Sequence, residues 1–178
     1  NVMNRIISVS ISLMITSLFM LTACSSQQVA EESKADNEVK QVVINWHKPK
    51  QYRDVRSPNG GQKHYQENVF YQLDKHFQKS AKKFLPQGFS MKVKVTDLNL
   101  AGDTRFHTIG NQEVRLIKPI YWPSMTFEYQ LYEGDKLVQS DSIKLKDISF
   151  MERSGFGRKS QGLYYEKRLI TDWFDDEV

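Results

Sequence analysis

The chain has 178 residues, 39% of them hydrophobic and 26% charged, with a formal net charge of +4. These ordinary globular values exclude a disordered chain, a collagen-like repeat and a protein with many membrane spans. The single cysteine also excludes a disulfide scaffold and a cysteine-rich zinc site.

Residues 1–23 have the pattern of a bacterial lipoprotein signal peptide. Arg5 supplies a basic start, the chain is apolar from Ile6 to Leu21 except for Ser and Thr, and no acidic residue precedes Glu31. The apolar run is shorter than the roughly 20 residues of a spanning helix. The last residues resemble a lipobox, in which the signal is cut before a cysteine that takes up lipid: Leu21-Thr22-Ala23-Cys24.

We therefore expect Cys24 to carry acyl chains such as palmitate, rather than to be a buried thiol behind an ordinary export signal. Several chains exceed the two-chain threshold for stable anchoring. Ser25 and Ser26 follow Cys24, where the sorting pattern has aspartate in proteins kept at the inner membrane. The resemblance implies the periplasmic face of the outer membrane. Residues 24–38 are polar and predict a flexible tether, which leaves 39–178 as a single domain.

Hydrophobic periodicity predicts the first elements of this domain. Residues 39–46 are rich in β-branched side chains and predict a strand. A helix is predicted over 61–85, because apolar residues recur there at spacings of three and four. A half-buried strand follows over 89–95, where apolar and polar residues alternate.

The second half predicts mainly strands. The polar stretch 105–111 indicates a loop, and 114–117 a short strand. Two runs, 125–131 and 136–146, predict a hairpin around Glu133-Gly134-Asp135. A glycine-rich loop over 154–162 then leads to a helix over 163–174. The expected fold is α+β, an α/β sandwich whose mostly antiparallel sheet has one long helix and a C-terminal helix packed on one face.

Several motifs together resemble the bacterial family called domain of unknown function 3016, found in small exported proteins and lipoproteins. They run in the family's order through the whole mature domain: Trp46, Pro49, Tyr52-x-Asp54, Leu85-Pro86-Gln87-Gly88, Asp97-Leu98-Asn99-Leu100-Ala101-Gly102, Trp122-Pro123, Tyr129, Leu145-x-Asp147, Tyr165-Glu166-Lys167-Arg168 and Asp172-Trp173-Phe174. The resemblance implies an exported α/β protein and no assigned activity.

Candidate catalytic and metal groups are few. His64 and His76 are twelve residues apart on the predicted helix, roughly 18 Å, which is too far to share an ion. We expect no metal site, and solvated or capping roles for these two histidines and for His47 and His107. Asp97, Asp103 and His107 follow the second strand, where a loop would have to gather them for acid–base work.

The alternative, purely structural interpretation is that Asp97 accepts backbone N–H groups, that Asp103 and His107 lie on a loop surface, and that Asp54 makes an Asx turn. Residues 155–160 lack the spacing of a phosphate loop, and no serine nucleophile elbow is present. We therefore expect no cofactor, and a binding protein rather than an enzyme.

The charge is unevenly distributed. From Gln41 to Lys118 there are 14 Lys and Arg against 6 Asp and Glu, whereas from Pro119 to Val178 there are 8 against 11. An exported protein meets lipid phosphates, peptidoglycan carboxylates and acidic proteins rather than nucleic acid. The candidate anion-binding surface is the lysine group of the predicted helix, with a merely solvated face as the alternative: Lys75, Lys79, Lys82 and Lys83.

The leading hypothesis is a non-enzymatic, outer-membrane-anchored lipoprotein that binds an envelope protein or an anionic envelope component. The first alternative is an envelope hydrolase that uses carboxylates near Asp97 and Asp103. The second is an accessory subunit of an envelope complex, docked through the exposed face of its sheet.

Overall fold

The computed structural model describes residues 40–107, 112–152 and 162–177. The expected signal peptide, Cys24, the tether and most of the glycine-rich loop lie outside these residues. The elements follow in chain order: β1 (Val42–Trp46), the 3₁₀ turn η1 (Pro49–Gln51), α1 (Gln62–Phe84), β2 (Phe89–Asn99), β3 (Asp103–His107), β4 (Gln112–Leu116), β5 (Ser124–Glu133), β6 (Lys136–Lys146) and α2 (Tyr164–Glu177).

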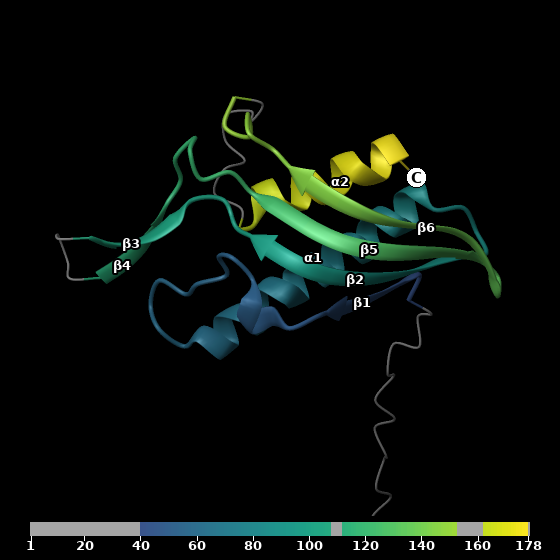
Figure 1. Ribbon diagram of the computed structural model, residues 1–178, viewed down its shortest axis with the longest axis horizontal. Coiled ribbons are helices and arrows are strands. Elements are labelled where there is room, and N and C mark those ends of the chain that lie inside the picture. Colours follow the sequence, from purple (N-terminus) through teal and green to yellow (C-terminus); the bar gives the residue numbers. More distant parts are fainter. Residues whose placement is uncertain (1–39, 108–111, 153–161, 178) are drawn as a thin grey trace, which may run out of the picture. The chain divides into compact units, whose positions relative to one another are not determined.

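Four of the strands form one sheet in the order β1-β2-β5-β6. β1 runs parallel to β2, whereas the β2–β5 and β5–β6 pairs are antiparallel. Figure 1 shows α1 and α2 together behind one face of this sheet. The structure therefore confirms the α+β fold, with one long helix and a C-terminal helix on the same face.

The main core lies between the sheet and the two helices. Phe127 of β5 is fully buried, and its ring centroid lies 6.1 Å from that of Phe77 on α1 and 4.9 Å from that of Trp173 on α2. The periodicity that predicts α1 is the stripe that it buries, at Val69, Leu73, Phe77 and Ala81. One aromatic side chain of the sheet thus contacts both helices.

β2 continues to Asn99, beyond the predicted strand over 89–95, and a β-bulge explains why the prediction ended too early. The pairing with β5 shifts register between Val95 and Asp97, so that one extra residue enters the strand. Val95 and Leu98 are both buried although they are three residues apart. The alternation therefore breaks at Thr96 while the strand continues to Asn99.

The prediction of a loop from residue 105 was wrong for its first residues. Asp103–His107 forms β3, which pairs antiparallel with β4 in a two-stranded ribbon separate from the main sheet. Figure 1 shows this ribbon extending beyond the end of the sheet. Phe106 on β3 is 60% exposed. A strand that packs against no core has no need of alternating apolar residues, so its pattern resembles that of a loop.

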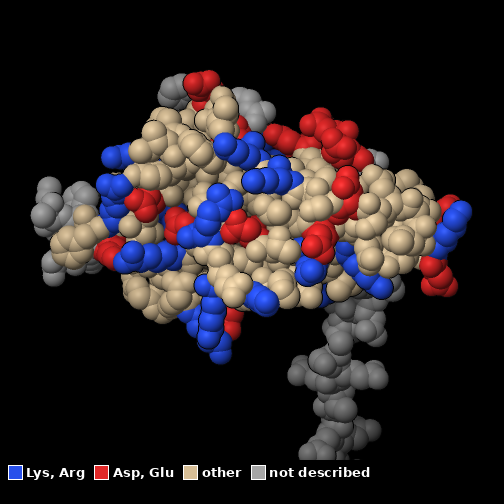
Figure 2. Space-filling view, viewed as in Figure 1, with Lys and Arg blue, Asp and Glu red and all other residues tan. Residues whose placement is uncertain are grey.

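The open face of the sheet is polar. Lys92, Lys94, Glu128 and Lys144 occupy the outward positions of neighbouring strands, and Lys94 pairs with Glu128 at 3.1 Å. Figure 2, which views the molecule from this side, shows basic and acidic groups interspersed. None of the helices in the described part of the chain is long and apolar enough to cross a bilayer.

Candidate functional site

A groove of about 530 Å³ lies between α1 and α2. Two hydrogen bonds join the helices here: the His76 ring nitrogen lies 2.8 Å from the Thr171 hydroxyl, and Lys167 donates to the Gln72 side-chain oxygen at 3.0 Å. The helical spacing that places Val69, Leu73 and Phe77 in the core turns the intervening polar residues toward this groove. The groove is therefore a polar surface depression along the contact between α1 and α2.

The lining of the groove is strongly basic. It includes Lys75 and Lys79 from α1 and Lys167 and Arg168 from α2, against the single carboxylate of Asp172, which pairs with Arg168 at 3.6 Å. Several like charges beside one concave surface create a local positive potential. This arrangement favours an anionic ligand.

His76 does not add to this charge at neutral pH. Burial lowers the pKa of its imidazole, and the nearby charges of Lys167 and Lys79 lower it further, although a hydrogen bond with the Lys167 backbone opposes them. The ordinary pKa of histidine is already about 6.5, so the ring is neutral at pH 7. Its role in the groove is the hydrogen bond to Thr171.

The structure brings together only half of the predicted lysine group. Lys75 and Lys79 line the groove, and the Lys75 ammonium also lies 5.6 Å from the Tyr71 ring centroid. Lys82 and Lys83 are exposed in the last turn of α1, outside the lining of the groove, and the Lys83 ammonium lies 4.2 Å from the Phe84 ring. Lys167 and Arg168 belong to a motif of the last helix, but they were not predicted to join this basic surface, because their helix is distant from α1 in the sequence.

The acidic candidates have separate arginine partners. Asp97 lies within β2, not after it, and pairs with Arg53 at 2.6 Å; its other oxygen accepts the Arg53 backbone N–H at 3.1 Å. Asp103 lies on β3 and pairs with Arg105 at 2.7 Å. His107 ends β3, and its side chain lies outside what the structure describes. Both carboxylates therefore hold local structure, and the hydrolase hypothesis gains no support from them.

The remaining histidines occupy separate places. His64 lies exposed in the first turns of α1, and the His47 backbone N–H donates to the Val95 carbonyl at 2.9 Å. In the described ranges, no three side chains among His, Cys, Asp and Glu are grouped so that they would hold a metal ion.

A second cavity, of about 310 Å³, lies beside the N-terminal end of α2. Arg115 of β4 forms one side of it, and its guanidinium joins distant segments: it pairs with Asp54 through both oxygens, at 2.9 and 3.2 Å, and donates to the carbonyls of Arg56, Ala101 and Gly102. The predicted Asx turn at Asp54 is present as a long 3.4 Å bond from the Arg56 N–H. Asp54 thus positions Arg115 as well as its own turn.

Glu166 is a buried residue of the lining of this cavity. The residue is 3% exposed, and its Oε1 accepts the Ala101 backbone N–H at 2.6 Å. Burial raises the pKa of the carboxyl, although the backbone N–H groups of Ala101 and Glu166, and then Arg115 and Lys167, act to lower it. Burial also raises the pKa of the nearby Tyr65 hydroxyl, against the lowering effect of Arg115.

The comparisons with known proteins identify the family of the chain. The model of the family described as "Protein of unknown function (DUF3016)" matches residues 40–176, from just before β1 to the last turn of α2. The chain belongs to this family. No match was found among curated proteins or among solved structures. The match confirms the resemblance drawn from the motifs, and DUF3016 membership leaves the activity open.

Three of the motifs that carry the DUF3016 resemblance meet at the second cavity. The first supplies Asp54, which holds Arg115; the second supplies Leu100 and Ala101; the third supplies Tyr165 and Glu166. In the sequence these residues stand out for their order along the chain, and no role was predicted for Glu166. The signal that it missed was a glutamate between the apolar residues Tyr165 and Leu169 of the last helix.

Proposed function

We propose that this chain is a lipid-anchored protein of the bacterial outer membrane that binds an anionic envelope component through the groove between α1 and α2. The observation that carries the binding role is the lining of that groove, where four cationic side chains meet one carboxylate. The anchor rests on the lipobox-like sequence that ends at Cys24. The role is one of surface binding, without a catalytic group.

The charges of the groove suit a ligand with several negative groups. Lys75 and Lys79 come from one helix and Lys167 and Arg168 from the other, so an extended anion lying along the groove would contact both. Lys167 and Arg168 are already held by Gln72 and Asp172, whereas the Lys75 ammonium lies over the Tyr71 ring. Lys75 and Lys79 are therefore the first residues to test.

The double variant Lys75→Glu/Lys79→Glu tests the groove. With Cys24→Ser as the background to remove the anchor, its binding to phosphatidylglycerol vesicles and to isolated peptidoglycan is measured by co-sedimentation at low and high salt. Each lysine near an anionic surface contributes about 1 kcal/mol, so we expect binding to weaken by about tenfold or more at low salt. High salt should reduce this difference, because it screens exposed charges.

Lys92→Glu/Lys144→Glu is the matched control, since it makes the same charge change on the open face of the sheet. We expect it to retain nearly all of the binding. Equal losses in both double variants would mean that only the net charge matters, and the groove proposal would then be wrong. If neither vesicles nor peptidoglycan bind, cross-linking in intact cells decides whether an acidic protein occupies the groove.

A further inference from the structure

We propose that the cavity formed by Tyr65, Arg115 and Glu166 is a second binding site, which takes a small carboxylic acid with an apolar body. It is distinct from the groove that carries the proposed function, because Gln72 and Tyr164 are the only described residues that line both. The proposal therefore stands or falls independently of that function.

The Arg115 guanidinium brings a buried N–H donor to the cavity. Nη1 and Nη2 of Arg115 are occupied by Asp54 and by backbone carbonyls. Its Nε is buried and makes no hydrogen bond of ordinary geometry in the described residues, although the guanidinium interacts with the Tyr65 hydroxyl, which also lines the cavity. The whole Arg115 side chain is only 15% exposed. Buried N–H groups are almost always paired, so one that makes no such bond beside a cavity indicates where an acceptor would bind. A carboxylate is the strongest acceptor for a guanidinium N–H.

The charge around the cavity favours an anionic ligand. α2 begins at Tyr164, which lines the cavity, and a helix of 14 residues favours an anion at its N-terminal end. The Lys167 ammonium is held close by, 2.9 Å from the Gly162 carbonyl. Among the described residues that line the cavity, only Glu166 has a carboxyl group, and its burial favours the uncharged form, which does not repel a carboxylate.

The apolar part of the lining favours a ligand with an apolar body. Apart from these polar groups, most of the lining is apolar or aromatic: Val69, Leu100, Ile117, Leu163, Tyr164 and Tyr165. A volume of about 310 Å³ is at the lower end of the range for small-molecule pockets. It suits a molecule of one ring or a short alkyl chain, and it excludes a polymer or a folded partner.

The test measures binding of four probes to the full chain. Phenylacetate and hexanoate are the aromatic and aliphatic acids, phenylacetamide is the neutral analogue, and 2-phenylethylamine is the cationic one. We follow the NMR signal of the Arg115 Nε–H group during titration with each probe. We expect saturable shifts with at least one acid, and an affinity for that acid at least about tenfold above that for the amine.

Ile117→Trp and Asn68→Trp each place a large side chain at the rim of the cavity, and each should weaken acid binding by about tenfold or more. Ile120→Trp is the control, because Ile120 is 64% exposed and lies outside the lining. The proposal is overturned if neither acid shifts the Arg115 signal in a saturable way. It is also overturned if the amine binds as tightly as the acids, or if Ile120→Trp weakens binding as much as the two rim variants.

Discussion

At the residue scale, two side chains organise the part of the domain where β2 gives way to the β3–β4 ribbon. Arg115 reaches from β4 to Asp54 and to three backbone carbonyls, and Glu166 reaches from α2 to the Ala101 N–H. Both side chains therefore meet the backbone near Ala101. Buried polar groups are usually hydrogen-bonded, and these contacts supply partners for Nη1 and Nη2 of Arg115 and for Oε1 of Glu166.

Gly102 allows these contacts to form. Its φ is +86°, and a Cβ at this position would lie 2.6 Å from the Leu116 carbonyl oxygen. Only a residue without a side chain lets the turn after β2 approach β4 so closely. The approach also places the Gly102 carbonyl within reach of Arg115, at 3.2 Å.

We predict that Gly102→Ala destabilises the protein more than Gly88→Ala does. Both glycines have nearly the same positive φ, but a Cβ at Gly88 would meet nothing within 4 Å. Gly88→Ala should cost about 1–2 kcal/mol for the left-handed backbone alone. Gly102→Ala should cost about 1–3 kcal/mol more, because a steric clash is added. Urea unfolding of both variants measures the difference, and equal losses would contradict the close approach.

At the element scale, α1 holds the parallel edge strand β1 in place. The rings of Trp46 and Phe70 stack with centroids 4.4 Å apart, and the Trp46 indole N–H donates to Asp74 at 3.0 Å. The Gln78 side chain also donates to the Val42 carbonyl and accepts its N–H. A helix side chain thus satisfies backbone groups of a strand that has a neighbour on only one side.

We predict that Trp46→Phe lowers the free energy of unfolding by about 1–3 kcal/mol at pH 7, because it removes the donor to a partly buried carboxylate. Burial raises the pKa of Asp74, and the Trp46 hydrogen bond opposes this effect. The bond stabilises the charged carboxylate, so the loss should shrink as the pH falls through the pKa of Asp74. Unfolding measured across that range tests this, and Trp46→Phe in an Asp74→Asn background is the control, since its loss should not vary with pH.

The element scale also shows where sequence patterns are sufficient. The helices over 61–85 and 163–174 and the hairpin were predicted within a few residues, because both helices and β5 bury one face against the core and the residues Glu133-Gly134-Asp135 mark the turn of the hairpin. β3 was missed, because none of the residues Asp103–His107 belongs to the hydrophobic core, so its pairing with β4 leaves no apolar alternation in the sequence. The end of β2 was missed because the bulge at Thr96 interrupts the alternation.

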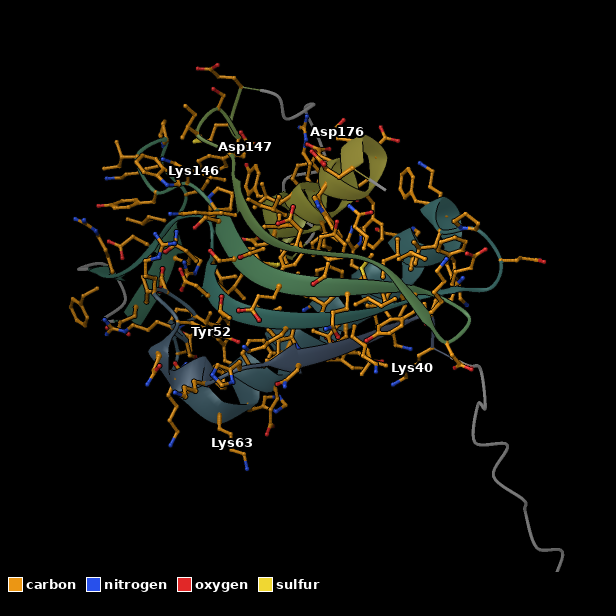
Figure 3. The ribbon with its side chains drawn as sticks, turned by 45° about the vertical axis from the view of Figure 1, so that its right-hand side comes forward. Lys40, Tyr52, Lys63, Lys146, Asp147 and Asp176 are labelled. Atoms are coloured by element: carbon orange, nitrogen blue, oxygen red, sulfur yellow. The ribbon has the colours of Figure 1, made fainter. Side chains whose placement is uncertain are left out.

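At the scale of the whole molecule, one face of the sheet carries both helices and the other is open. The open face combines both signs of charge, whereas the groove between the helices is lined mainly by cations. Figure 3 shows Asp176 on the last turn of α2, and with Asp175 and Glu177 it makes that end of the helix acidic. The basic and acidic halves of the sequence therefore do not become two separate halves of the surface, because α2 contributes to both.

The proposed anchoring concerns the chain as a whole, and we predict that it depends on Cys24. Mass spectrometry of the mature protein should find an acylated Cys24 as its first residue, and Cys24→Ser should move the protein out of the outer-membrane fraction. Ser25→Asp is the informative control, since it should keep the lipid and shift the protein to the inner membrane. An unmodified sulfur, or a Cys24→Ser variant that still fractionates with outer membranes, would show that the lipid is not the tether.

The sequence by itself determined the family, the α+β fold and the helices and hairpin whose apolar residues recur with a regular period. The helices and the hairpin are local features, so a single segment contains the information for each, whereas the family is identified from motifs along the whole domain. Only the tertiary structure decided that Lys75 and Lys79 meet Lys167 and Arg168, and that Asp54, Arg115 and Glu166 gather around one cavity. Such sites join residues from distant segments, and the packing of α2 beside α1 and of β4 beside Gly102 brings them together.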